Sequence, residues 1–137
     1  MLAAAGLKRL ALESRIRECF EPDQMLPAAG QGALGIEVRA ERADLLALLA
    51  PLDSRRDGLA TAAERAVSRA MGGSCSMPLA AYATLAGGEL TLRAAWGDAE
   101  GGGTLLRAEG RAAAGDLVAA RRLGGDVAAQ LRAAGAH

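Results

Sequence analysis

The stretch from residue 53 to residue 96 constrains the fold of this 137-residue chain most strongly, because its pattern changes there from helical to β. In the first part, 53–71, apolar residues recur at the i, i+4, i+7 and i+8 positions of one helical face. Asp53 is the expected N-cap, and Gly72 and Gly73 supply the positive φ that ends many helices. The apolar residues that follow alternate with the two-residue period of a strand. We therefore predict a helix that leads directly into a sheet.

Three β-like runs make up the expected sheet, at residues 79–85, 89–96 and 104–110. A hairpin through Gly87 and Gly88 is the natural connection between the first two runs. One face of the second run carries Leu90, Leu92, Ala94 and Trp96. This alternation predicts that one side of the sheet is buried.

Helices are expected to cover that side of the sheet. Leucines at helical spacing predict a helix at 42–50, which Pro51 ends. Residues 115–135 predict a last helix, bent at Gly124 and Gly125. Its buried side is expected to carry Leu117, Val127, Ala128 and Leu131. Helices on one face of a three-stranded antiparallel sheet make an α+β domain with a single core.

The first 39 residues do not complete this domain. Short helices are expected at 2–10 and 12–20, and a strand at 34–38. A lone strand needs a partner sheet, and these helices are too short to close a core. We therefore divide the chain into 1–39, an incomplete part left over from other domains, and 40–137, the α+β domain.

Charge and composition exclude several classes of protein. Sixteen Lys and Arg residues balance sixteen Asp and Glu residues, so the chain has no general attraction for nucleic acid or for an anionic membrane. No apolar run approaches the ~20 residues of a membrane span. The single His, His137, and two distant cysteines, Cys19 and Cys75, form no metal-ligand set and argue against Cys/His catalysis. One possible disulfide makes no disulfide scaffold, which favours a reducing cytoplasm.

Two short motifs remain as candidate sites. Cys75 lies on the loop after the helix, where the helix dipole disfavours a thiolate. Chemistry alone therefore favours a buried structural cysteine over a nucleophile, with covalent attachment of a group as a third option. Gln31 lies between two glycines, and spacing alone favours a solvated turn. The GQG run lacks the third glycine and the following helix of a dinucleotide-binding loop.

Three segments give the chain a more specific resemblance. They read AAAGLKRLALESRIR at 3–17, LPAAGQGALGIEVR at 26–39 and ERAVSRAMGGSCSMPLAAYA at 64–83. In this order and spacing they resemble the porphobilinogen deaminase family, also called the hydroxymethylbilane synthases, across essentially the whole chain. The resemblance implies a cytoplasmic, monomeric transferase of tetrapyrrole (porphyrin and heme) biosynthesis. Such an enzyme condenses four porphobilinogen molecules with loss of ammonia.

The resemblance also implies site residues. By its place in GGSC, Cys75 corresponds to the cysteine that holds the family's dipyrromethane cofactor through a thioether. Arg9 corresponds to an arginine whose guanidinium binds the acidic side chains of cofactor or substrate. Gln31 and Gly32 correspond to positions that line the same cleft, and Ala3 corresponds to a small residue of that cleft. These five residues make up the expected cofactor-binding set.

Part of the family pattern is not matched. The family's catalytic aspartate and most of its arginine cluster lie N-terminal to the matched segments, so we expect no catalytic residue in this chain. We expect a fragment, the C-terminal portion of the enzyme, inactive without the missing N-terminal domains. Two alternatives stay open. One is a non-catalytic α+β interaction module with a structural cysteine; the other is a piece that assembles with a separate N-terminal part through a strand edge at 34–38.

Overall fold

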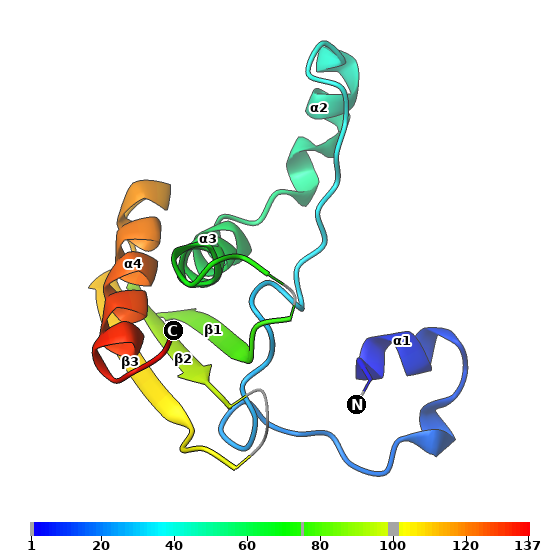
Figure 1. Ribbon diagram of the computed structural model, residues 1–137. Coiled ribbons are helices and arrows are strands. Elements are labelled where there is room, and N and C mark those ends of the chain that lie inside the picture. Colours follow the sequence, from blue (N-terminus) through cyan, green and yellow to red (C-terminus); the bar gives the residue numbers. More distant parts are fainter. Residues whose placement is uncertain (1, 75, 99–101) are drawn as a thin grey trace.

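A three-stranded sheet with two helices on one face forms the packed part of the structure (Figure 1). The computed structural model describes residues 2–74, 76–98 and 102–137. In chain order the elements are α1 (Ala4–Arg9), the 3-10 turn η1 (Glu13–Arg15), α2 (Ala43–Leu49), the 3-10 turn η2 (Ala50–Leu52), α3 (Arg55–Ala70), β1 (Leu79–Ala86), β2 (Glu89–Trp96), β3 (Leu106–Ala113) and α4 (Leu117–Ala133). The predicted α+β class is confirmed.

The sheet is antiparallel and has the order β1-β2-β3. Gly87 and Gly88, with φ of +57° and +80°, connect β1 to β2 as predicted. A two-residue hairpin turn of this kind needs positive φ at both positions, which glycine adopts without strain. The register places Leu79 opposite Trp96.

The third strand begins later than the sequence suggests, at Leu106 and not at residue 104. Its start is set by β2, because Leu106 is the partner of Trp96, the last residue of that strand. Residues 97–103 connect β2 to this region, and residues 99–101 lie outside the described residues.

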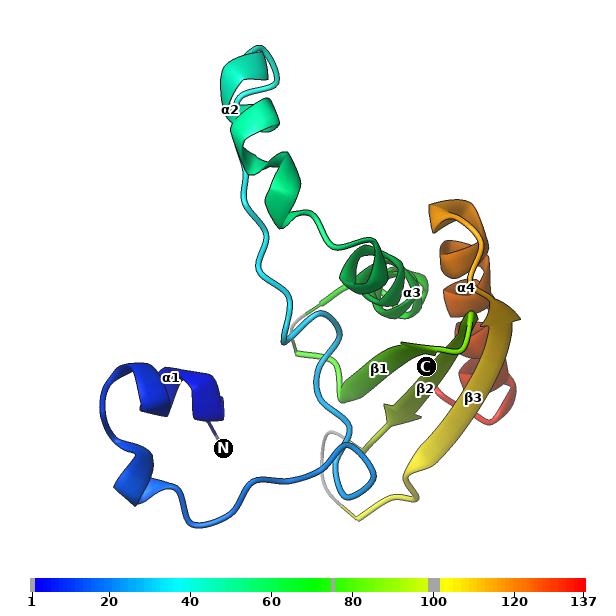
Figure 2. The ribbon, with the colours of Figure 1, turned by 180° about the vertical axis from the view of Figure 1, so that it is seen from behind.

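The core lies between the sheet and the two helices, which cover the same face in both views (Figures 1 and 2). The predicted inward face of β2 is confirmed, since the buried residues include Leu90, Leu92, Ala94 and Trp96. The helix α3 buries Leu59, Ala63, Glu64 and Val67. The helix α4 buries Ala120, Leu123, Gly124, Val127, Ala128 and Leu131. Many of these side chains are small, so the two helices can approach each other closely.

Gly124 marks the closest approach of α4 to α3. A Cβ at this position would lie 2.6 Å from Cβ of Ala66 and closer still to the backbone of Ala63. The sequence predicted a bend at Gly124 and Gly125, but contact between helices is the role that the structure gives to Gly124. The guanidinium of Arg132 adds a hydrogen bond to the carbonyl oxygen of Ala70, at the end of α3.

The ends of the two long helices differ in detail from the sequence prediction. Ser54 caps α3, with its Oγ accepting from the N–H of Asp57 at 3.3 Å, so the predicted cap at Asp53 is wrong by one residue. Asp116 caps α4. Leu117 was expected on the buried side of α4 but is 45% exposed, because it is the first residue of the helix and precedes the part that packs on α3.

Two segments of the N-terminal part of the chain, around α1 and around α2, extend away from the packed domain (Figure 1). Within the described chain, α1 contacts only η1, and α2 contacts only η2 among the helices and strands. The helix predicted at 12–20 is reduced to the turn Glu13–Arg15, because a short segment without a packing partner gains little from helix formation. The strand predicted at 34–38 is also absent there: the segment pairs with no other strand, and Leu34 is 97% exposed.

Candidate functional site

The loop after α3 starts with two glycines that fix how the chain leaves the helix. Gly72 and Gly73 have φ of +114° and +68°. The N–H of Gly73 donates to the carbonyl oxygen of Ser68 at 2.8 Å, and the N–H of Gly72 donates to that of Arg69 at 3.2 Å. These two bonds form a Schellman motif, as expected for glycines at a helix C-terminus. The cysteine loop, residues 72–78, therefore leaves α3 in a defined direction.

Cys75 itself lies outside the described residues, but its neighbours are held by hydrogen bonds. The hydroxyl oxygens of Ser74 and Ser76 are 2.7 Å apart, and the N–H of Ser76 donates to Oγ of Ser74 at 3.2 Å. The carbonyl oxygen of Pro78 accepts from the N–H of Gly97 at 2.8 Å, which joins the end of the loop to the end of β2. Both serines are exposed. The described part of the cysteine loop is thus fixed at both ends, with residues 72–74 and 76 exposed and Met77 and Pro78 half-buried.

Gln31 lies in a tight turn, residues 28–33, which we call the GQG turn. The N–H of Gln31 donates to the carbonyl oxygen of Ala28 at 3.1 Å, and its Oε1 accepts from the N–H of Ala28 at 3.0 Å. The predicted turn is therefore confirmed. Among the described residues, the side-chain nitrogen of Gln31 and the N–H of Gly32 have no partner, and both residues are exposed. They are donors that an acceptor such as a carboxylate can use.

Residues 23–30, here called the strap, include the first three residues of this turn and connect it to the packed domain. The carboxylate of Asp23 forms an ion pair with the guanidinium of Arg93 on β2. The carbonyl oxygen of Pro27 accepts from the N–H of Ala81 at 3.1 Å, which satisfies a donor on the edge of β1. The strap is therefore attached to the sheet, unlike the helices α1 and α2 on either side of it.

Glu64 of α3 links the strap to the domain a third time. Its Oε2 accepts from the N–H of Gly30 at 2.7 Å, and its Oε1 accepts from the N–H of Ala83 at 2.8 Å. The residue is only 7% exposed, and it is the one charged residue among the buried described residues. Burial raises the pKa of the Glu64 carboxyl, and the two N–H donors offset this in part. One carboxylate therefore contacts the GQG turn and the edge of β1 at once.

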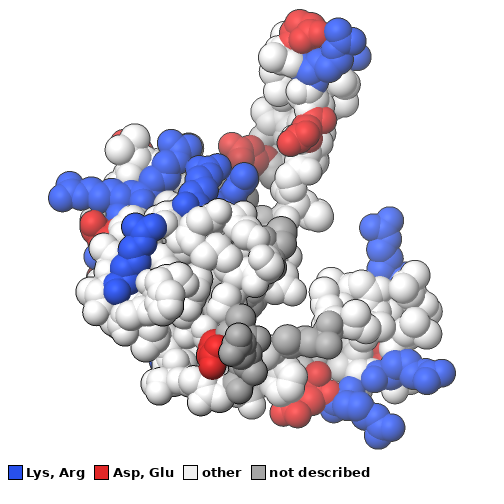
Figure 3. Space-filling view, in the orientation of Figure 1, with Lys and Arg blue, Asp and Glu red and all other residues white. Residues whose placement is uncertain are grey.

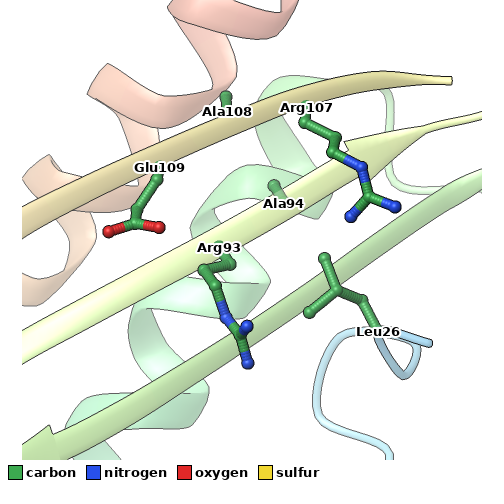
Figure 4. A pocket seen from close by; sticks show the side chains of 6 residues that line it. All are labelled: Leu26, Arg93, Ala94, Arg107, Ala108 and Glu109. Carbon is green, nitrogen blue, oxygen red and sulfur yellow. The ribbon is translucent and has the colours of Figure 1, made fainter. Parts of the chain in front are cut away.

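A pocket of about 360 Å³ lies beside the strap (Figure 4). It opens on the face of the sheet away from the helices, because Arg93 alternates along β2 with the buried Leu92. The guanidinium carbon of Arg93 lies 5.9 Å from the centre of the Tyr82 ring. The pocket is lined by Leu26, Arg93, Ala94, Arg107, Ala108 and Glu109. None of the predicted site residues that the structure describes lines it.

Arg9 and Ala3 lie on a separate part of the chain. Arg9 is in the last turn of α1, as predicted, and Ala3 directly precedes the helix. Both are exposed, and among the helices and strands of the described chain α1 contacts only η1. No hydrogen bond or ion pair between described residues joins Arg9 or Ala3 to the GQG turn, and α1 stands apart from the packed domain (Figure 1).

Several other groups bear on the range of possible chemistry. In the described parts of the chain, no group of three or more His, Cys, Asp and Glu side chains is placed to hold a metal ion. The same parts contain no helix of the length and apolarity that a membrane span requires. Cys19 is an exposed free cysteine. Basic side chains gather over α3 and α4 with acidic ones beside them (Figure 3), and Arg65 and Arg69 of α3 are exposed.

Two models of known protein families match parts of this chain. Residues 59–133, which contain the sheet, α4 and most of α3, match the family model described as "Porphobilinogen deaminase, C-terminal domain". The chain belongs to the porphobilinogen deaminase family. Residues 1–47 match a second model, "Porphobilinogen deaminase, dipyromethane cofactor binding domain". The two porphobilinogen deaminase matches include both the GQG turn and the cysteine loop, so the resemblance seen in the sequence is confirmed.

Individual relatives give the same result. Over 134 residues the chain is 64% identical to a porphobilinogen deaminase of Albidiferax ferrireducens. The aligned region covers 98% of this chain and 42% of the relative. It is 54% identical over 136 residues to a porphobilinogen deaminase of Paraburkholderia phymatum, with 99% and 41% covered. The chain thus spans about two fifths of the length of these curated relatives.

Sequence reasoning missed two residues that organise this site. Glu64 had a visible signal, because it lies seven residues before Met71 and therefore on the same side of α3 as the apolar face. An acidic residue on an apolar face indicates a buried partner. Asp23 had no comparable signal, because its partner Arg93 is 70 positions away.

Proposed function

We propose that this chain is the cofactor-anchoring, C-terminal part of a hydroxymethylbilane synthase. This transferase polymerises four porphobilinogen molecules with loss of ammonia in tetrapyrrole biosynthesis. The observation that supports the proposal most is the match to both family models in order along the chain, with GGSC at the end of α3. The alternative, a non-catalytic interaction module, is not favoured by these matches.

We assign the covalent attachment of the dipyrromethane cofactor to Cys75. In forming the thioether, the carbon–sulfur bond replaces the bond between the pyrrole methylene carbon and its leaving group, and the thiol proton departs with that group. Such a thiol reacts once, so a strongly activated thiolate is not required. The hydrogen bonds around Ser74 and Ser76 support this assignment, because they hold the flanks of the loop still and exposed. When bound, the cofactor supplies the pyrrole end from which the product chain grows.

The remaining predicted residues are proposed to hold carboxylates and pyrroles. The side-chain nitrogen of Gln31 and the N–H of Gly32 are exposed donors suited to an acidic substituent. Arg9 offers a planar guanidinium that can bind a carboxylate through two hydrogen bonds. The small side chain of Ala3 is proposed to leave room for the cofactor in the same cleft. We assign the proton transfers to the part of the family sequence that this chain does not cover, and no catalytic acid or base to the chain itself.

The segments before and after the strap are proposed to contact the part of the family sequence that this chain does not cover. The helix α2 has no buried residue, and residues 34–38 pair with no strand in the described chain. Exposed apolar side chains on these two segments and on η2 are Leu34, Ile36, Leu46, Leu48 and Leu52. We expect these segments to fold against the N-terminal domain of the family, either in one polypeptide or in a complex with a separately produced N-terminal part. The assembled protein is expected to be a cytoplasmic monomer without nucleic acid or membrane partners.

The domain boundary between 1–39 and 40–137 stays a prediction. The first family match ends at residue 47 and the second begins at residue 59, with the end of α2 between them. Limited proteolysis of the chain, with the cleavage sites read by mass spectrometry, tests it. Cleavage near residue 40 supports the predicted boundary, and cleavage after α2 places it later.

A chimera tests the proposed activity. The C-terminal two fifths of the Albidiferax ferrireducens relative are replaced with this chain, and hydroxymethylbilane formation from porphobilinogen is measured. We expect activity that Cys75→Ser abolishes and that Cys19→Ser, a matched control at an exposed cysteine, leaves in place. A folded chimera that forms no product, or one that stays active with Cys75→Ser, would reject the proposal.

A further inference from the structure

Glu64 is the one charged residue among the buried described residues of α3. It lies on the helix face that supplies Ala63 and Val67 to the core. A charge that is only 7% exposed loses most of its hydration, and hydrogen bonds seldom return all of that loss. In some proteins such a group is retained because it determines geometry, and not because it adds stability.

The two hydrogen bonds that Glu64 accepts show which parts of the structure it holds together. One oxygen holds the N–H of Ala83, on the edge of β1, and this bond belongs to the packed domain. The other holds the N–H of Gly30, which is 34 positions away in sequence and belongs to the GQG turn. Gly30 has a φ of +70°, and its carbonyl oxygen accepts from the N–H of Ala33 at 3.1 Å. Fixing Gly30 therefore fixes both sides of the turn.

The cysteine loop is attached to the same helix. Glu64 lies seven residues before Met71, the C-cap residue of α3, and Gly72 begins the loop through the Schellman motif. At 1.5 Å of rise per residue this separation is about 10 Å along the helix axis. The distance from the carboxylate to the start of the loop is thus spanned by one rigid element.

We propose that Glu64 is a positioning residue that sets the GQG turn at a fixed place relative to the cysteine loop. The meaning of that arrangement for catalysis rests on the proposed function, in which the turn and the loop hold the same cofactor. The attachment of Gly30 to α3 through Glu64 is independent of the proposed function, because it concerns only the structure of the chain.

Amide hydrogen exchange of the 137-residue chain, read by NMR, tests the structural part. Glu64→Leu removes both acceptors, whereas Glu64→Gln keeps one oxygen and presents an NH₂ group to the other donor. Val67→Ala is the matched control, since it weakens the packing of the same helix at a fully buried position and leaves both acceptors of Glu64 in place. We expect exchange at Gly30 and Gln31 to rise about tenfold in Glu64→Leu beyond the control, and less in Glu64→Gln. Exchange no faster than in the control overturns the proposal, and Glu64→Gln decides it if Glu64→Leu does not fold.

Kinetics of the chimera described above test the catalytic part. A displaced GQG turn should raise KM for porphobilinogen about tenfold in Glu64→Gln with a smaller change in kcat, while Val67→Ala leaves KM unchanged. An unchanged KM in Glu64→Gln overturns the role in the reaction. If the unmutated chimera is inactive, the proposed function fails, and the exchange experiment still decides whether Glu64 positions the turn.

Discussion

Gly124 of α4 lies against Ala63 of α3 so closely that a Cβ on Gly124 would be 2.4 Å from the carbonyl oxygen of Ala63. Real Cβ atoms do not approach a backbone oxygen to that distance, so a larger residue must separate the helices. Gly124→Ala should therefore lower the free energy of unfolding by about 1–3 kcal/mol despite the better helix propensity of alanine. Urea denaturation followed by circular dichroism measures the change.

The neighbouring glycine is the control for this prediction. A Cβ on Gly125 would meet nothing within 4 Å, and the residue is exposed on the same helix. Gly125→Ala should leave stability unchanged or raise it by up to about 1 kcal/mol, through helix propensity alone. If both substitutions had the same effect, the close contact between α3 and α4 would not be what selects glycine at 124.

The cap of α4 gives a second stability prediction. Oδ1 of Asp116 accepts from the N–H of Val118 and of Ala119, both at 2.9 Å. Asp116→Ala leaves these donors without their partner and should cost about 0.5–2 kcal/mol in thermal or urea unfolding. Asp126→Ala, an exposed aspartate within the same helix, should cost less than about 0.5 kcal/mol. Equal losses would argue against a capping role.

The raised pKa of Glu64 predicts how stability depends on pH. A carboxyl whose pKa is higher in the folded than in the unfolded state binds its proton more tightly in the folded state. Its stabilising contribution is complete below the ordinary value of 4.5 and is lost as the pH rises through the raised folded pKa. The difference in unfolding free energy between the wild type and Glu64→Gln should therefore fall as the pH rises above about 4.5. A difference that grows with pH over this range would contradict the prediction.

The ion pair between Asp23 and Arg93 should contribute little to stability. The two side chains are 85% and 31% exposed, so water and salt screen the attraction. In a double-mutant cycle with Asp23→Asn and Arg93→Gln we expect a coupling energy below about 1 kcal/mol that shrinks further in 1 M salt. Glu21→Gln, an exposed change in the same segment, serves as the control. Coupling well above this value would mean that the pair, and not Glu64, is the main anchor of the strap.

The sequence predicted those elements that carry their own pattern. The alternation of Leu90, Leu92 and Ala94 located β2 and its buried face, and Gly87 with Gly88 located the hairpin. Boundaries that depend on a partner were less accurate. The start of β3 is fixed by pairing with β2, which no local pattern at residue 104 could reveal.

The errors near the N-terminus have a related cause. Residues 34–38 have strand character, but a strand forms only where another strand supplies hydrogen-bond partners, and none does so in the described chain. In the site, local spacing located the GQG turn and the glycines before the cysteine loop. The contact of Glu64 with Gly30 joins positions far apart in sequence, so only the folded chain shows it.

The central claim is that this chain anchors a covalent cofactor through Cys75, and intact mass measures this most directly. The chimera with the N-terminal part of the Albidiferax ferrireducens relative is purified after expression with porphobilinogen, and its mass is compared with that of the bare polypeptide. We predict an increase of two linked pyrrole units that remains in Cys19→Ser and disappears in Cys75→Ser. A folded chimera of bare mass, or an adduct that persists in Cys75→Ser, would contradict the claim.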